Sequence, residues 1–304
     1  MVTATRSKGK SKKKYNKPSV FKVQTDQMID NILKNKGLPW HKPWTGVFGA
    51  HQNAISGHIY QGMNPFWIDV LGGDQYEDYR WLTYKQGKAN GSTLKDGEYH
   101  KSITLLKPLI LERKKNEGEL EEEVIKFPIF RYYKVFNVEQ WEGLNVEPLS
   151  KPNATEFVPI EEAEKILNGI PNKPVTLHNG GDRAYYRMKE DTIHLPDRST
   201  FDSPNEYYST RFHEEGHSTG HESRVGREGI QNFDHFGSGQ YAKEELVAEF
   251  VSAILCRQSG IDNTRENSEA YLRSWIGKLR NDEKLLVSAS SQAHKATSYI
   301  LGGE

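Results

Sequence analysis

Two histidines four residues apart, His213 and His217, enclose Glu214 in the pattern His-Glu-x-x-His. On a helix, residues at this spacing lie one turn apart on the same face, so both imidazoles can reach one metal ion. Glu214 follows the first histidine and can reach the open coordination position of the ion without binding it. There it would take a proton from a water molecule that the ion activates and pass it to a leaving amine. The pattern predicts metal-dependent hydrolysis of a peptide bond.

Catalytic zinc sites usually have three protein ligands, so a third is expected beyond His217. A second helix is expected over residues 243–256, where Glu245 and Glu249 lie at i, i+4 on one face. We predict that Glu245 is the third ligand and that Glu249 accepts the outer N–H of a ligand histidine. Glu244, which points about 100° away around this helix, is the alternative ligand.

The donor set of two imidazoles and one carboxylate favours zinc, although manganese or cobalt could replace it. Such a site can also persist as a structural centre without catalysis, which is the alternative reading of the pattern. His221 and His235 are expected to have ordinary polar or structural roles. Cys256 ends an apolar run and is expected in the core.

The helix that carries the two histidines has a clear start. Ser203 can cap it, Pro204 suits the first helical position, and Glu206 stands three residues after the cap, as in a capping box. Other elements follow from apolar periodicity. Helices are expected over residues 24–36, 160–167 and 271–279, and strands over residues 103–111, 127–138, 174–177 and 184–195. Within the last of these, residues 192–195 are the expected edge for an extended substrate.

The length of 304 residues allows two domains, and the prolines near residue 150 mark a linker. We expect an α+β protein with two domains, a mixed N-terminal one and a C-terminal metallopeptidase domain. The expected division is a disordered basic tail at 1–17, a first domain at 18–145, a linker at 146–159 and a second domain at 160–304.

Composition narrows the class of protein. Lys and Arg number 41 and so do Asp and Glu, so the overall charge indicates neither nucleic-acid binding nor an acidic DNA mimic. The single cysteine excludes an internal disulfide, which fits a reducing compartment. No apolar run approaches the roughly 18 residues of a membrane-spanning helix, so a cytoplasmic protein without a membrane partner is expected.

Five of the six tryptophans lie before residue 146, interleaved with lysines and arginines. Aromatic rings stack on unpaired bases and cations contact phosphates, so this half could bind single-stranded nucleic acid. The alternative is that these tryptophans form an ordinary core.

Eight segments match one known family, and they do so in the family's order. They are residues 38–44, 56–64, 81–86, 133–140, 180–186, 191–196, 207–221 and 241–249. Through them the sequence resembles the ArdC antirestriction proteins of plasmids and phages. The resemblance implies an N-terminal single-stranded DNA-binding domain, a C-terminal zincin-like metallopeptidase domain, and protection of incoming DNA from host restriction.

The residues expected to contact DNA are aromatic, basic or amide side chains of the first domain. They are Trp40, Lys42, Trp44, Asn64, Trp81, Lys85 and Lys134. The leading hypothesis is a zinc protease that cuts a protein on or near single-stranded DNA, with a host restriction component as one candidate substrate. The alternative is a binding protein that coats single strands and whose metal site is structural.

Overall fold

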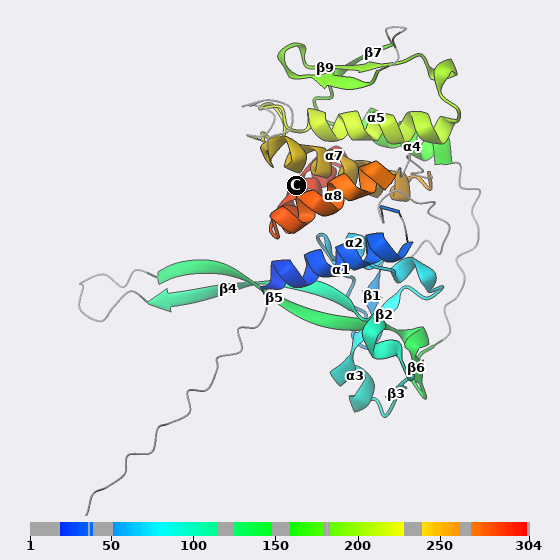
Figure 1. The fold of residues 1–304 in the computed structure, drawn as a ribbon, viewed down its shortest axis with the longest axis vertical. Coiled ribbons are helices and arrows are strands. Elements are labelled where there is room, and N and C mark those ends of the chain that lie inside the picture. The colour runs from blue at the N-terminus through cyan, green and yellow to red at the C-terminus, as the bar shows by residue number, and fades with distance from the viewer. Residues whose placement is uncertain are drawn as a thin grey trace, which may run out of the picture.

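The computed structural model describes residues 19–35, 37–38, 51–114, 124–147, 159–178, 181, 183–227, 239–261 and 269–302. Trp40, Lys42, Trp44 and His235 lie outside the described residues, as do the basic tail and most of the expected linker. Helices and sheets divide between an N-terminal and a C-terminal part that lie one above the other in Figure 1, which confirms the α+β class with two domains.

The N-terminal domain is built on a four-stranded sheet in the order β1-β2-β5-β4, with every pairing antiparallel except that of β1 with β2. The two longest strands form a hairpin that extends sideways from the domain (Figure 1). The elements of this domain are α1 (Val20–Asn35), β1 (Gln52–Asn53), α2 (Asn64–Val70), β2 (Arg80–Thr83), α3 (Tyr84–Ala89), β3 (Thr93–Leu94), β4 (Ile103–Lys114), β5 (Val124–Asn137) and β6 (Trp141–Glu142).

The tryptophans of this domain that the structure describes belong to its interior. Trp67 and Trp81 are 1% and 0% exposed, and Trp141 is 5% exposed. The indole N–H of Trp81 donates to Nδ1 of His51 at 3.1 Å. A buried ring offers no free face to a base, so Trp81 has a core position and not the DNA contact expected for it.

The C-terminal domain places a three-stranded sheet over a layer of helices (Figure 1). The strand at 192–195 is central in this sheet, with the order β7-β9-β8, so it is not the free edge expected from the sequence. Strand β9 is hydrogen-bonded to a neighbouring strand along both of its edges. The free edges of the sheet therefore belong to β7 and β8. The elements are α4 (Pro159–Gly169), β7 (Val175–His178), β8 (Tyr185–Arg187), β9 (Thr192–Leu195), α5 (Pro204–Ser218), α7 (Gly239–Gln258), α8 (Glu269–Asn281) and α9 (Leu285–Ile300).

Helix α5 begins as the sequence predicts. The hydroxyl of Ser203 accepts the backbone N–H of Glu206 at 3.2 Å, and Pro204 occupies the first turn. The carboxylate of Glu206 accepts the backbone N–H of Asp202 at 3.0 Å, one residue before the cap, so the reciprocal bond of the expected capping box is displaced by one position. The start of the helix is fixed from both sides.

The two domains share a continuous apolar core. Phe250 of α7 packs on Phe66 and Trp67 of α2, with ring centroids 4.8 and 6.3 Å apart. Beside these rings the carboxylate of Asp69 meets the guanidinium of Arg257 at 2.8 Å. A mostly buried ion pair and tilted or edge-on aromatic contacts therefore join the domains. Among the helices that the structure describes, none is long and apolar enough to cross a membrane.

Candidate metal centre

A glycine allows the two helices of the site to approach closely. A Cβ atom added to Gly216 of α5 would lie 3.0 Å from Cα of Ala248 and 3.2 Å from Cβ of Val251, both in α7. Any side chain at this position would push the helices apart. Gly216 stands between the two histidines in the sequence, so the histidines and the glutamates of α7 meet where the helices are closest.

The structure brings His213, His217 and Glu245 together. Their potential ligand atoms all lie within 4.8 Å of one another. The Nε2 atoms of His213 and His217 lie 3.7 and 3.5 Å from the carboxylate oxygens of Glu245. Two atoms that bind one zinc ion at about 2.1 Å with a tetrahedral angle would be about 3.4 Å apart. The donor set therefore fits a divalent ion with little rearrangement.

The other imidazole nitrogens face two further carboxylates. Nδ1 of His213 lies 3.9 Å from Glu249, and Nδ1 of His217 lies 3.6 Å from Glu244. Small inward movements would turn these contacts into the outer hydrogen bonds that orient metal-binding histidines. Glu249 is thus on the side of the site where the sequence predicts it, and Glu244 has the corresponding place beside the second histidine.

Glu244 is held away from the ligand position by an arginine. Nε of Arg227 donates to Glu244 at 2.9 Å, and both side chains are 5% exposed. Arg227 also donates to the backbone carbonyl of Gly216 in α5 at 2.8 Å, so this arginine connects α5 with Glu244 of α7. Because a buried cation already neutralises Glu244, the geometry favours Glu245 as the third ligand.

Electrostatics of the site suit a cation. Burial works to lower the pKa of His217, but the surrounding carboxylates, Glu244 first, raise it to about 9. Burial works to raise the pKa of Glu245, but the two histidines lower it to about 2. Because these carboxylates raise the pKa of His217, a divalent ion that binds here would compete with a proton for the imidazole.

The three ligand side chains differ in their exposure to solvent. The side chains of His213 and His217 are 8% and 14% exposed, whereas that of Glu245 is 25% exposed. Glu214 is 6% exposed and lies close enough to His217 to contribute to its raised pKa. An ion held by these three protein ligands would have a further coordination position for water, and Glu214 lies near the cluster.

Sequence reasoning missed Tyr241. This residue is in the first turn of α7, four residues before Glu245, and the two side chains are hydrogen-bonded. Burial and the charges of Glu245 and Glu214 raise the pKa of the Tyr241 hydroxyl to about 12, so it remains a donor at neutral pH. The expected helix began at residue 243, which left Tyr241 outside it; an earlier start would have shown the i, i+4 spacing.

We expect Tyr241→Phe to lower metal affinity by about 10- to 100-fold, because Glu245 would lose the donor that orients it. Competition with a chelating dye measures this. Tyr208→Phe is the control, since its hydroxyl donates to Glu164 at 2.7 Å, away from the three ligands. Equal affinity of Tyr241→Phe and the wild type would show that the hydroxyl does not orient Glu245.

The remaining residues expected to contact DNA are spread over the N-terminal domain. The side-chain amide of Asn64 is engaged with the backbone of Leu106, at 2.9 and 3.1 Å. Lys85 is exposed on α3. The ammonium of Lys134 lies 5.1 Å from the centre of the Tyr99 ring, which is 52% exposed. Lys134 and Tyr99 thus form an exposed cationic and aromatic surface, whereas the side-chain amide of Asn64 is already hydrogen-bonded within the domain.

Comparison with known proteins agrees with this architecture. A family profile described as a zincin-like metallopeptidase matches residues 161–292, and a profile for the N-terminal domain of the anti-restriction factor ArdC matches residues 19–136. The chain belongs to the ArdC family. This confirms the resemblance stated from the sequence and agrees with the divalent-metal site built by α5 and α7.

Two solved structures of the antirestriction protein ArdC from plasmid R388 are similar to this ArdC-family chain. The metal-free one matches with a TM-score of 0.67 and 28% identity, covering 94% of this chain and 99% of that chain. The Mn(II)-bound one matches with a TM-score of 0.66 and 29% identity, covering 93% of this chain and 97% of that chain.

Curated relatives include much longer proteins. Two proteins named DNA primase TraC from Escherichia coli are 35% and 34% identical over 300 and 302 residues. This chain spans only 27% and 20% of their lengths. An uncharacterized protein, y4eC of Sinorhizobium fredii, is 27% identical, and the match covers 92% of this chain and 91% of that protein.

Proposed function

We propose that this protein is a zinc-dependent peptidase that cuts a protein bound to or near single-stranded DNA, and so protects incoming plasmid or phage DNA from restriction. The observation that carries the proposal is the convergence of His213, His217 and Glu245 beside Glu214. Two imidazoles and a carboxylate with an open position are the donor set of hydrolytic zinc sites. A protein that only needed a structural ion would gain nothing from a carboxylate such as Glu214 beside that position.

In this proposal each residue around the metal centre has a separate role in hydrolysis. A divalent ion held by the three ligands would supply Lewis-acid activation at the open position. Glu214 accepts a proton from the attacking water and then gives it to the leaving amine. Glu244 and Glu249 would orient the two imidazoles from the Nδ1 side, so that Nε2 faces the site, and the hydroxyl of Tyr241 holds Glu245.

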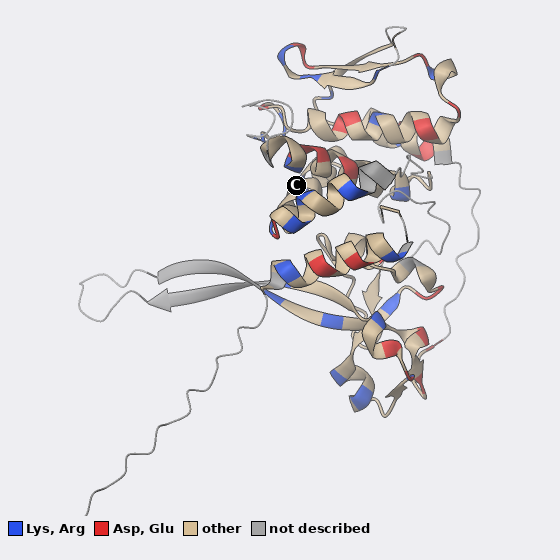
Figure 2. Cartoon of the chain, in the orientation of Figure 1, with Lys and Arg blue, Asp and Glu red and all other residues tan. Residues whose placement is uncertain are grey.

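The DNA part of the proposal is supported by the N-terminal domain. Its family profile is that of the ArdC N-terminal domain, and similar sequences occur within proteins named DNA primases. Basic residues mark the described part of β5 and helix α3, whereas acidic residues mark α5 and α7 around the metal centre (Figure 2). Basic side chains on β5 and α3 suit contact with the phosphates of a DNA strand, and the carboxylates of α5 and α7 suit a cation.

The test is cleavage of casein and of restriction-enzyme subunits by the full chain after removal of metal and after reloading with Zn²⁺ or Mn²⁺. We expect cleavage only in the metal-loaded protein and faster cleavage when single-stranded DNA is present. Stoichiometric metal without cleavage of any substrate would favour the alternative, a protein that coats single strands and uses the ion structurally. Faster cleavage with Mn²⁺ than with Zn²⁺ would contradict the assignment of zinc.

A further inference from the structure

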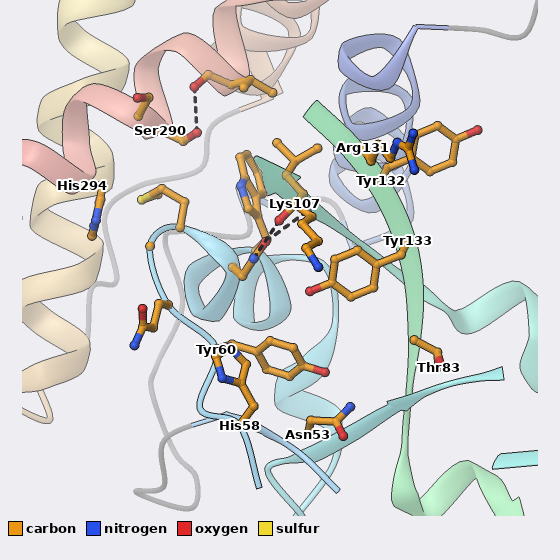
Figure 3. A pocket seen from close by; sticks show the side chains of 18 of the residues that line it. Asn53, His58, Tyr60, Thr83, Lys107, Arg131, Tyr132, Tyr133, Ser290 and His294 are labelled. Carbon is orange, nitrogen blue, oxygen red and sulfur yellow. Dashed lines mark hydrogen bonds between the residues drawn. The ribbon is translucent and has the colours of Figure 1, made fainter. Parts of the chain in front are cut away.

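A cavity of about 1010 Å³ lies away from the metal centre, between the sheet of the N-terminal domain and helix α9 of the C-terminal domain (Figure 3). The strands contribute Lys107, Arg131 and Tyr133, and the segment after β1 contributes Tyr60. His294 lines the cavity from helix α9 of the other domain. Both domains are therefore needed to form this cavity.

The charge of the cavity wall is one-sided. Among the described residues that line it, none is Asp or Glu, although the chain has 41 acidic residues. Lys107 and Arg131 stand directly opposite each other in the register of β4 and β5, and neither pairs with a described carboxylate. Like charges in this position destabilise a sheet. A bound anion would relieve the repulsion.

The wall also has aromatic rings. Tyr60 is 6% exposed and Tyr133 is partly buried, and both line the cavity. Burial and the neighbouring Tyr60 raise the pKa of Tyr133 to about 12, so both hydroxyls stay neutral. Trp67, in the floor, has an indole N–H without a hydrogen-bond partner. Neutral rings and a spare donor suit a planar ligand with acceptor atoms.

The wall from the C-terminal domain is one stripe of α9. Val287, Ser290, Ser291 and His294 are spaced i, i+3, i+4 and i+7, so they lie on one face of the helix. Ser291 and His294 are exposed, while the opposite face of α9 belongs to the core. Helix α9 packs along α7, which carries Glu245.

From these features we propose that the cavity holds an unpaired nucleotide of a single-stranded DNA, with its phosphate at Lys107 and Arg131 and its base against the partly exposed ring of Tyr133, and that α9 forms part of this site. The proposal rests on the DNA part of the proposed function and adds a location and a second contributing domain. A strand bound here touches the same domain that carries the metal ligands. Stacking on aromatic rings and cationic contacts to phosphate are the two interactions that hold single strands.

The test is fluorescence anisotropy of a labelled thymidine oligomer of about 12 nucleotides with the full-length chain. Three variants each remove one unit of positive charge or add one negative charge: Arg131→Gln in the sheet, Ser291→Glu on the cavity face of α9, and Lys295→Gln. Lys295 is exposed on α9 but does not line the cavity, so Lys295→Gln is the matched control. We expect Arg131→Gln and Ser291→Glu to weaken binding by about tenfold or more, and Lys295→Gln to bind as the wild type does.

Different results would overturn different parts of the proposal. Wild-type affinity of Ser291→Glu together with weak binding of Arg131→Gln would restrict the DNA site to the N-terminal domain. Equal weakening by Lys295→Gln would indicate general charge attraction without a cavity. Thymidine monophosphate that competes as strongly as the oligomer would identify a free nucleotide as the ligand. Metal content and casein cleavage measured on the same variants separate a failure of this site from a failure of the peptidase.

Discussion

Replacing Glu214 by glutamine is expected to lower the rate of protein cleavage by about 10²- to 10⁴-fold while leaving metal content unchanged. Glutamine has nearly the same shape but cannot accept the proton of the attacking water at neutral pH. Glu214 is not one of the three residues whose ligand atoms converge, so the ion should still bind. Initial rates of casein cleavage and elemental analysis of the same preparations measure the two effects.

Glu222→Gln is a matched control for this substitution. Glu222 is exposed and follows α5 in the chain, so its replacement makes the same chemical change outside the site. The control should cleave at the wild-type rate. Protection of transferred DNA in cells should follow the cleavage rate; protection by Glu214→Gln equal to that by the wild type would separate the biological role from proteolysis.

Replacing Glu245, the carboxylate among the three metal ligands, is expected to lower metal affinity strongly. We expect Glu245→Ala to lower affinity by more than about 100-fold, beyond the 10- to 100-fold that loss of an outer hydrogen-bond partner costs. Glu244→Gln should fall within that smaller range, because its oxygen still accepts from Arg227 and lies near Nδ1 of His217. Chelator competition on both proteins gives the order of the two affinities. The reverse order would make Glu244 the ligand.

The local features of the site were accessible from the sequence because they depend on short spacings. The cap at Ser203 and the helix through His217 follow from i, i+3 and i+4 rules, and the i, i+4 spacing of Glu245 and Glu249 pointed to the second helix of the site. Helix α7 nevertheless begins at Gly239, four residues before the expected start, and this difference hid Tyr241. Helix ends are set by tertiary contacts that a single sequence does not display.

The features that were missed depend on long-range contacts. Whether Trp81 faces solvent or the core depends on residues 30 positions away, such as His51. The central place of β9 follows from its pairing with both β7 and β8, which periodicity cannot predict. The cavity between β5 and α9 joins residues more than 150 positions apart, and its residues are ordinary tyrosines, serines and basic side chains without a motif.

Helix α7 contributes to two different contacts along its length. Glu245 faces the metal centre, and Phe250, little more than one turn later, is packed between the aromatic rings of α2 in the other domain. An ion that binds only the native arrangement of α5 and α7 raises the free energy of unfolding of everything that depends on α7. Through Phe250 this includes helix α2, so occupancy of the metal centre becomes a thermodynamic term in the stability of the N-terminal domain.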